Sequence, residues 1–344
     1  MQAPLLTIVI PCYNEEEILP ETISALSALL EDMIGRHQVD QGSRLLFVDD
    51  GSKDHTWKII YKEIIKGGFV KGLKLARNAG HQNALLAGIS AAKEASDCMV
   101  TIDADLQDDI HVIPSFIERF KEGCEIVYGV RAKRKTDSFF KRTTAESFYK
   151  LMGRMGVDLV YNHADFRLMG RRAVEELEKF GESNMFLRGI VPLIGFKTAE
   201  VYYDRKERLA GETKYPLKKM LAFAFDGITS FSITPIRMVL LVGVLSFLGS
   251  LGFGGYFLLL KFFGETETGW TSLITSIWLI GGLQLMGLGL VGEYIGKIYK
   301  ETKRRPKYIV DMDLFNFPLP RHLLNGERTD EYYSMDAGQL PETN

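Results

Sequence analysis

Apolar and polar positions alternate along roughly the first 130 residues in a way that predicts strands and helices in turn. Short apolar runs rich in β-branched residues predict strands, and longer segments with an apolar face of helical period predict helices. The expected strands are Leu5–Ile10, Leu45–Val48, Val70–Leu75, Met99–Ile102 and Ile126–Tyr128. The expected helices are Glu16–Leu30, Thr56–Ile65, Asn83–Lys93 and Val112–Phe120. This alternation favours an α/β fold whose mainly parallel sheet is covered by helices on both faces.

Two long apolar runs lie near the C-terminal end of the sequence, Met238–Leu260 and Trp270–Gly292. Each run lacks charged residues and has about the length that a helix needs to cross a ~30 Å hydrocarbon layer. Core helices of soluble proteins are usually shorter and amphipathic, whereas these runs are apolar on all sides and rich in glycine. The pattern predicts two transmembrane helices, and their glycine-rich faces favour a homo-oligomer through close helix packing.

Charges around the two runs indicate an orientation. Basic residues precede the first run and follow the second, while the loop between them, Gly264–Gly269, contains no lysine or arginine. This asymmetry predicts a multi-pass protein of the cell (inner) membrane, with its soluble domain and both termini cytoplasmic. Tyr215–Ser232 mixes apolar residues with Lys218 and Lys219, which favours an interfacial helix lying on the membrane. Packing of that helix on the domain's own core is the alternative.

The predicted organisation therefore has four parts. They are a cytoplasmic α/β domain at 1–214, an interfacial amphipathic helix at 215–235, a two-helix transmembrane hairpin at 236–296 and a cytoplasmic C-terminal tail at 297–344. The tail after Tyr308 is acidic and weakly patterned, so we expect it to be poorly ordered. The segment Met1–Leu6 lacks the basic and apolar regions of a signal peptide.

Composition narrows the range of partners. A net charge of −2 argues against a nucleic-acid partner, because a protein that binds the phosphate backbone is usually basic. The three cysteines, Cys12, Cys98 and Cys124, are widely spaced, which favours reduced cytosolic thiols over a disulfide or zinc framework. His81 and His163 lie beside polar motifs but form no metal-ligand pattern, so we expect surface or packing roles for them.

Polar motifs follow four of the predicted strands. They are Pro11–Glu15, Asp49–Ser52, Arg77-Asn78 and Asp103–Asp105. Ligands of parallel sheets bind beyond the carboxyl ends of the strands, so we expect these motifs to form one site. Asp103 and Asp105 can place hard oxygen ligands on Mg²⁺ or Mn²⁺, which in turn binds a diphosphate, and Gln107 offers a further oxygen. A second Asp-x-Asp sequence, Asp311–Asp313, lies in the tail, where we expect no catalytic role.

Taken together, the motifs resemble a known family. They are Ile8–Glu16, Val48–Asp54, Arg77–Gln82 and Asp103–Asp108. In this order they are similar to the motifs of the inverting family-two glycosyltransferases with the GT-A fold. Ala164–Met169, Arg205–Tyr215 and the two-helix anchor further resemble polyprenyl-phosphate glycosyltransferases. These include the bactoprenol glucosyltransferases and, more distantly, the dolichol-phosphate-mannose synthases. The resemblance covers about residues 5–305.

The resemblance implies a GT-A, Rossmann-like catalytic domain with a nucleotide-sugar donor site. The residues expected at the donor are Pro11, Tyr13, Asn14, Glu15, Asp49, Asp50, Arg77, Asp103 and Arg131. The loop Pro11–Glu15 and the pair Asp49-Asp50 can hold the base and ribose of a nucleotide by hydrogen bonds. Two alternatives remain: Asp49, Asp50 and Ser52 cap the following helix, or Asn78 serves packing or a turn.

The resemblance also places Asp165 at the acceptor, as the proposed base or as the group that orients the acceptor. A phosphate acceptor has a second pKa of about 6, so deprotonation by a base contributes little near neutral pH. The alternative is a structural Asp165 paired with Arg167. Arg205, Arg208 and Lys214 are expected to bind the lipid phosphate. Part of this basic segment is expected to interact with anionic lipid headgroups instead.

The combined expectation is a membrane-anchored, metal-dependent, inverting hexosyltransferase. It would move a hexose, glucose in first place, from a UDP-sugar to polyprenyl (undecaprenyl) phosphate. N-acetylglucosamine and mannose are alternative sugars. A processive polysaccharide synthase is one rival, but such enzymes carry a Gln-x-x-Arg-Trp motif, and none of Trp57, Trp270 and Trp278 follows an arginine. A non-catalytic nucleotide-sugar-binding scaffold is the second rival, against which the acidic motifs argue.

Overall fold

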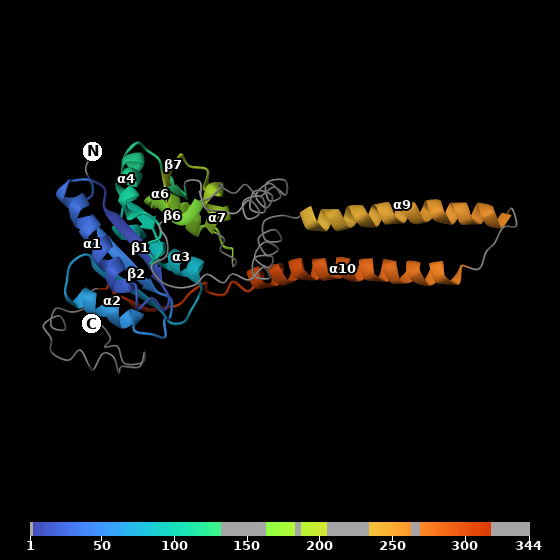
Figure 1. Ribbon diagram of the computed structural model, residues 1–344, viewed down its shortest axis with the longest axis horizontal. Helices are drawn as coiled ribbons and strands as arrows, with labels where there is room; N and C mark the ends of the chain where they lie inside the picture. The colour runs from blue at the N-terminus through green and yellow to red at the C-terminus, as the bar shows by residue number, and fades with distance from the viewer. Residues whose placement is uncertain (1–2, 132–162, 183–186, 205–233, 263–268, 318–344) are drawn as a thin grey trace. The chain divides into compact units, whose positions relative to one another are not determined.

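The structure is a computed structural model that describes residues 3–131, 163–182, 187–204, 234–262 and 269–317 (Figure 1). The chain divides into two compact units. One comprises residues 1–145, 159–213 and 306–344, and the other residues 146–158 and 214–305. The predicted interfacial helix, Tyr215–Ser232, lies outside the described residues, as does the predicted hairpin loop apart from Gly269.

One sheet organises the described part of the first unit, with the strand order β7-β5-β6-β4-β1-β2-β3-β8. The strands are β1 Leu6–Cys12, β2 Arg44–Asp49, β3 Val70–Leu75, β4 Cys98–Thr101, β5 Ile126–Arg131, β6 His163–Gly170, β7 Thr198–Tyr203 and β8 Val310–Asp313. β6 pairs antiparallel with β4 and β5, and β8 pairs antiparallel with β3. The remaining pairs are parallel. The α/β fold with a mainly parallel sheet is thus confirmed.

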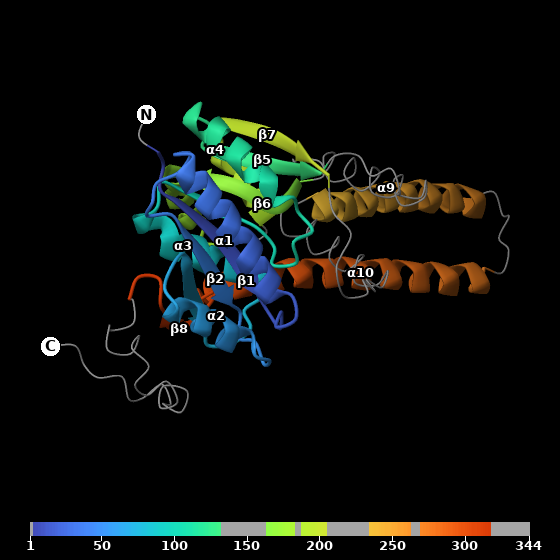
Figure 2. The same cartoon turned by 60° about the vertical axis from the view of Figure 1, so that its left-hand side comes forward.

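Helices cover both faces of this sheet (Figure 2). They are α1 Leu19–Gly35, α2 Thr56–Ile65, α3 His81–Ala92, α4 Ile113–Lys121, α6 Arg171–Glu178 and the short α7 Leu187–Ile190. α1, α2 and α4 pack on one face, whereas α3 and α6 pack on the other. β1 serves both cores because its side chains alternate: Ile8 and Ile10 join the cluster under α1, and Val9 faces α3. Gly88 of α3 lies so close to the sheet that a Cβ there would be 2.3 Å from Val9 Cγ1.

The C-terminal segment rejoins the sheet, although the sequence predicts poor order after Tyr308. β8 adds to the edge of β3, with Asp313 opposite Leu73. Lys74 Nζ donates to Asp311 Oδ2 at 2.8 Å, and Leu314 is 4% exposed in the core. The prediction of disorder is therefore wrong for residues 309–317. An otherwise unpaired strand edge offers backbone hydrogen bonds that a composition-based argument does not register.

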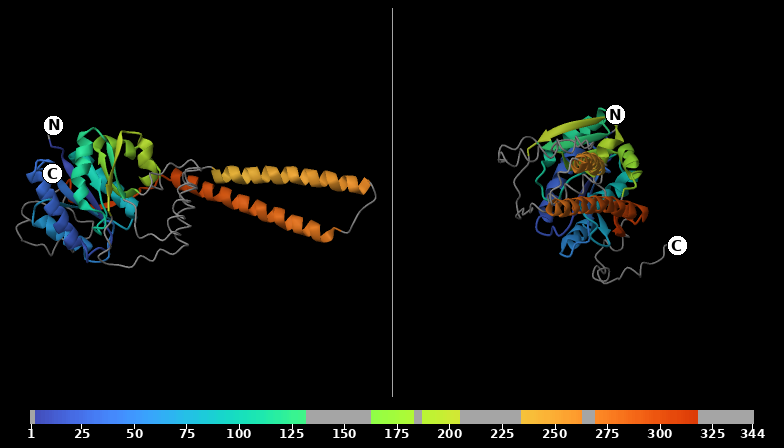
Figure 3. Two further views of the ribbon diagram at one scale, coloured as in Figure 1. Left: turned by 45° about the horizontal axis from the view of Figure 1, so that its top comes forward. Right: turned by 90° about the vertical axis from the view of Figure 1, so that its right-hand side faces the viewer.

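Two long helices form the described part of the second unit (Figure 3). They are α9, Thr234–Phe262, with 29 residues, and α10, Trp270–Thr302, with 33 residues. Among the described residues, Leu279–Thr302 is the one helical segment long and apolar enough to cross a membrane, and the described apolar part of α9 is shorter. Both predicted runs are helical, and the crossing of a membrane by both stays a prediction.

Candidate active site

The loops after β1 and β2 hold each other through hydrogen bonds. The Asn14 N–H donates to Ser52 Oγ at 3.0 Å, and Asn14 Oδ1 accepts from the Lys53 N–H at 2.8 Å. Asn14 has a φ of 55°, a left-handed conformation that asparagine tolerates better than most residues. Pro11 is buried in β1, while Tyr13 is exposed in the loop. The first two predicted motifs therefore meet beyond the carboxyl ends of two adjacent parallel strands.

Asp50 joins the end of β2 to the loop after β3. Its Oδ1 accepts from the Ala79 N–H at 2.6 Å, and its Oδ2 accepts from the Gly80 N–H at 3.0 Å. Burial raises the pKa of Asp50, and these two hydrogen bonds oppose the rise. Gly51 follows with a φ of 66°, and a Cβ there would lie 2.6 Å from the carbonyl carbon of Arg77. The close approach of the two loops thus requires glycine at this position.

Asp49 is fully buried at the end of β2. Its Oδ1 accepts a 3.4 Å hydrogen bond from the Ser52 N–H, whereas its Oδ2 has no hydrogen-bond partner among the described residues. Burial raises the pKa of this carboxyl. The alternative in which the Asp49–Ser52 motif caps α2 is wrong, because the Thr56 N–H donates to Asp54 Oδ1 at 3.0 Å.

Asp103 and Asp105 lie in the turn after β4. Asp103 Oδ1 is buried without a hydrogen-bond partner in the described part of the chain. Burial, together with the charges of neighbouring carboxylates, raises the pKa of Asp103 to about 6. Asp105 Oδ1 accepts from the Gln107 N–H at 3.2 Å, and Leu106 between them has a φ of 52°. The turn therefore holds two acidic side chains close together in sequence and space.

This set of side chains fits a hard divalent cation. A cation beside Asp103 would coordinate the oxygen that lacks a hydrogen bond and offset the cost of a buried charge. Mg²⁺ is commonly held by one or two carboxylates together with substrate phosphates, so a complete protein cage is not required. Within the described ranges, no three His, Cys, Asp or Glu side chains form such a cage. The third predicted ligand, Gln107, is buried in the same turn.

Arg131 ends β5 and is held by a buried acidic residue. Its Nη2 and Nε donate to Asp108 Oδ1 at 3.1 and 3.3 Å. The Tyr203 hydroxyl donates to the same oxygen at 2.6 Å. Burial lowers the pKa of Arg131, but Asp108 and Tyr203 raise it overall, so its guanidinium stays charged. The sequence predicts Arg131 as a site residue but indicates neither of its two supports.

Asp165 lies on β6 among four side chains that direct nitrogen atoms at its carboxylate. Arg167 Nη2 donates to Oδ1 at 2.6 Å. Arg188 Nε donates to Oδ1 at 3.3 Å, and its Nη2 donates to Oδ2 at 3.1 Å. Gln82 Nε2 donates to Oδ2 at 3.1 Å, and His81 Nε2 lies 3.4 Å from the same oxygen. Asp165 is thus buried and extensively partnered.

These partners keep Asp165 ionised. Burial alone would raise its pKa, but His81, Arg167 and Arg188 lower the pKa well below its usual range. A carboxylate with so low a pKa is a poor general base near neutral pH. The structural alternative, a pair with Arg167, is present in the structure, yet Arg167 is one of four partners and does not explain the others.

His81 connects the two acidic parts of the site. Its Nε2 lies 3.5 Å from Asp103 Oδ1 and 3.4 Å from Asp165 Oδ2. Burial lowers the pKa of His81, but Asp165 and Asp103 raise it above its usual value overall. The sequence-based expectation of a surface or packing role does not include these two contacts with carboxylates. The position of His81 within the motif Arg77–Gln82 could have identified it as a site residue. Arg188 lies in no motif that the sequence analysis identifies.

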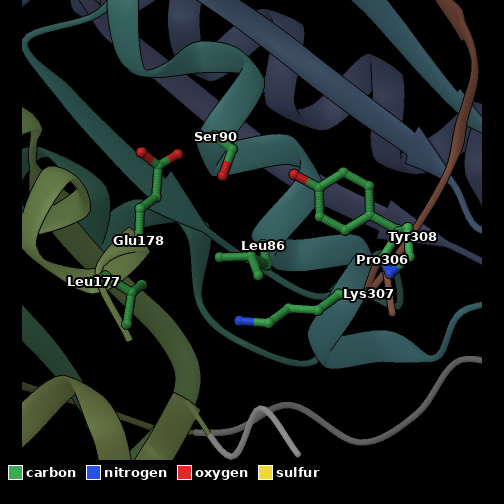
Figure 4. Close-up of a pocket in the computed structure, with 7 residues that line it drawn as sticks. All are labelled: Leu86, Ser90, Leu177, Glu178, Pro306, Lys307 and Tyr308. Carbon is green, nitrogen blue, oxygen red and sulfur yellow. The ribbon is translucent and has the colours of Figure 1, made fainter. Parts of the chain in front are cut away.

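Some predicted site residues are not brought to these clusters. Arg205, Arg208 and Lys214 lie outside the described residues. A cavity of about 340 Å³ lies elsewhere in the first unit, where the segment leading to β8 approaches α3 and α6 (Figure 4). Its lining residues are Leu86, Ser90, Leu177, Glu178, Pro306, Lys307 and Tyr308. None of them is a predicted site residue, so the carboxylate clusters and not this cavity define the candidate site.

The first unit is an α/β domain with a mainly parallel sheet, and acidic side chains gather around His81 beside that sheet. The profile of glycosyl transferase family 2 matches residues 7–178. The chain belongs to glycosyl transferase family 2 and is a glycosyltransferase.

Known proteins resemble nearly the whole chain. The uncharacterized glycosyltransferase YkoT of Bacillus subtilis (strain 168) is 60% identical over 96% of this chain and 98% of its own length. The bactoprenol glucosyl transferase of Shigella phage SfV is 40% identical over 89% of this chain and 97% of its own length. A crystal structure of glucosyl-3-phosphoglycerate synthase from Mycobacterium tuberculosis with Mn²⁺, UDP and glucosyl-3-phosphoglycerate has a TM-score of 0.40 at 17% identity. That match covers 66% of this chain and 78% of that chain.

Proposed function

We propose that this glycosyltransferase moves a hexose, with glucose as the first candidate, from a UDP-sugar to a polyprenyl phosphate at the cytoplasmic membrane face. The observation that carries the proposal is the connection through His81 between Asp103 and Asp165. His81 thereby links Asp103, which is expected at the donor diphosphate, to Asp165, which is expected at the acceptor. The bactoprenol glucosyl transferase of phage SfV supports a lipid acceptor, because it is similar over nearly its full length.

The donor nucleotide is proposed to bind where the loops after β1, β2 and β3 meet. Tyr13, Asn14 and Arg77 have exposed side chains there and are available to the base, ribose or phosphates. Both oxygens of Asp50 already accept backbone hydrogen bonds. Asp50 is therefore assigned to holding the third loop in place, with Asp49 behind it in the core.

Asp103, Asp105 and Gln107 are the residues that would hold Mg²⁺ or Mn²⁺. When bound, the cation neutralises charge on the departing diphosphate. The chain supplies the acidic turn that receives it and, in Arg131, a second positive charge fixed by a buried carboxylate. Both features favour an anionic substrate at this edge of the sheet.

The proposed reaction is an in-line displacement. A phosphate oxygen of the lipid forms a bond with the anomeric carbon, while the bond from that carbon to the diphosphate oxygen breaks with inversion. UDP leaves with the bonding electron pair. The acceptor phosphate has a second pKa of about 6 and needs no strong base near neutral pH. Asp165, whose pKa is lowered, is therefore assigned to positioning and not to proton abstraction.

A membrane location suits such an acceptor. The segment Leu279–Thr302 of α10 exposes large apolar side chains, which a hydrocarbon layer would bury. We propose that α9 and α10 both cross the membrane and that the segment Tyr215–Ser232, as its sequence predicts, lies at the membrane surface. Arg205, Arg208 and Lys214 are proposed to bind the lipid phosphate on the basis of the sequence.

A transfer assay tests the proposed function. Purified full-length protein in detergent micelles is incubated with Mg²⁺, undecaprenyl phosphate and one of UDP-glucose, UDP-N-acetylglucosamine or GDP-mannose. Mass spectrometry of the lipid fraction is expected to show one added hexose, most abundantly with UDP-glucose. A polymeric product would favour the processive synthase, and the absence of any glycosylated lipid with all three donors would contradict the proposal.

A further inference from the structure

Arg188 is held through its side chain and through the backbone of the residue before it. The guanidinium donates twice to Asp165, at 3.3 and 3.1 Å. The preceding residue is held as well: the Leu187 N–H donates to Gln82 Oε1 at 3.3 Å, and the Leu187 carbonyl accepts from Arg167 Nη1 at 3.4 Å. Gln82 and Arg167 also donate to Asp165. One network therefore sets the direction in which the guanidinium of Arg188 points.

Charge balance at Asp165 does not require Arg188. Arg167, 1% exposed, already pairs with Asp165 Oδ1 at 2.6 Å, and one guanidinium balances one carboxylate. Arg188 adds a second positive charge, and its side chain is 40% exposed. Within the part of the chain that the structure describes, its Nη1 has no hydrogen-bond partner. A charged guanidinium that is held on one edge and open on the other is suited to bind an anion.

The neighbours of Arg188 indicate which anion. Asp103 and Arg131 are close enough for their charges to affect its pKa. His81 further links Asp103 to Asp165, which holds Arg188. The open edge therefore belongs to the site in which two phosphate-bearing substrates are proposed to react.

We infer that Arg188 binds a substrate phosphate and that Asp165 is the positioning residue that directs its guanidinium. This inference rests on the proposed function for the two phosphates that can reach Arg188, the phosphate of the lipid acceptor and the diphosphate of the donor. Arg188 is not among the basic residues that the sequence indicates for this role.

The test uses full-length protein in detergent micelles. Arg188→Gln removes the charge, whereas Arg188→Lys keeps the charge without the planar fork. Both variants are expected to fold, because Asp165 keeps Arg167 and Gln82 as partners. Arg172→Gln is the matched control, since that side chain is 69% exposed and pairs with Glu125 away from the site. Thermal unfolding of each preparation checks folding.

Two equilibrium titrations distinguish the phosphate sources, one with undecaprenyl phosphate and one with UDP-glucose and Mg²⁺. Loss of a charge-assisted pair of hydrogen bonds weakens binding by roughly ten- to hundredfold. Arg188→Gln should weaken one of the two affinities by that factor, Arg188→Lys should recover part of it, and Arg172→Gln should bind as wild type does. Asp165→Asn should weaken the same affinity, because the guanidinium loses its anchor.

Each outcome has a defined meaning. Weaker acceptor binding assigns Arg188 to the lipid phosphate, and weaker donor binding assigns it to the diphosphate. Wild-type affinity of Arg188→Gln for both ligands overturns the inference. If Arg188→Gln fails to fold, Arg188→Met, which also removes the charge, takes its place in both titrations. Weaker binding of one ligand then supports the inference, and wild-type affinity for both overturns it. Binding of both ligands by a wild-type protein that transfers no sugar would contradict the proposed function alone.

Discussion

At the residue scale, substitution of Asp105 by Asn removes the charge of the side chain but keeps its hydrogen bond to the backbone. Asn in its place keeps the oxygen that accepts the Gln107 N–H at 3.2 Å, so the turn should persist. A bound cation stabilises the charge of the transition state by several kcal/mol. If the Asp105 carboxylate helps to hold that cation, Asp105→Asn should lower the rate of sugar transfer by about 10²-fold or more. Chelator should abolish wild-type activity, and Mg²⁺ or Mn²⁺ should restore it.

The tail supplies the control for this prediction. Asp311 belongs to the second Asp-x-Asp sequence and forms a partly exposed ion pair with Lys74 at the sheet edge. Asp311→Asn should leave transfer activity within about twofold of wild type, because such pairs contribute little to stability. Equal losses in both variants, or full wild-type activity in excess chelator, would contradict the assignment of the cation to Asp105.

Asp49 permits a prediction about pH. Burial raises its pKa in the folded state, so ionisation of Asp49 costs stability above that pKa, and the cost disappears as the pH falls toward the unfolded value of about 3.9. Asp49→Asn removes the ionisation. The variant should therefore melt at a higher temperature than wild type at pH 8, and the difference should narrow as the pH is lowered toward 4. Thermal unfolding at pH 8 and at pH 4 measures this, and a variant less stable than wild type at pH 8 would contradict it.

Sequence motifs identify the acidic residues of the site but not what surrounds them. Asp103, Asp105 and Asp165 stand in recognisable contexts, and the structure places the first and the last on either side of His81. The donors around Asp165 come from β6 itself, α3 and α7. The pair with Arg167, two residues along the same strand, can be predicted from the sequence. The contacts of Gln82 and Arg188 cannot, because they depend on how α3 and α7 pack on the sheet.

At the element scale, periodicity predicts elements but not the direction of every strand. The alternation along the first 130 or so residues correctly indicates β1 to β5 and the helices between them. It does not indicate that β6 inserts antiparallel between β4 and β5, since that pairing depends on contacts between distant segments. Helix α1 begins at Leu19 and not at Glu16, because Pro20 suits a first helical turn. Strand β8 is missed because its apolar content is low.

β8 should matter for stability through the residue that follows it. Leu314 is 4% exposed, so Leu314→Ala should leave a cavity that costs roughly 2–5 kcal/mol and lower the melting temperature by several degrees. Phe317→Ala is the control, because that side chain is 74% exposed. Thermal unfolding of the two variants in the same detergent compares them. Equal melting temperatures would show that the tail does not contribute to the folded unit.

At the scale of the whole molecule, β8 constrains how the chain can cross a membrane. β3 precedes α9 in the chain and β8 follows α10, yet the two strands pair within one unit. The segments before and after the helices must therefore lie on the same side of any membrane. If α10 crosses, the chain must cross a second time between β3 and α10, since a folded sheet cannot be divided by a bilayer, and α9 is the described helix that is proposed to do so. This argument is independent of the distribution of basic residues, and the two agree.

A labelling experiment checks this topology. One variant carries Thr268→Cys in the predicted external loop, and another carries Asn344→Cys at the C-terminus. The native Cys12, Cys98 and Cys124 are buried, so wild type should give little background. A thiol reagent that cannot cross membranes should label the first variant in intact cells and both variants after permeabilisation. Labelling of the second variant in intact cells would place the sheet outside, because β8 and the tail belong to the same unit. The active site would then lie away from cytoplasmic nucleotide-sugars, and the proposed donor would have to be abandoned together with the orientation.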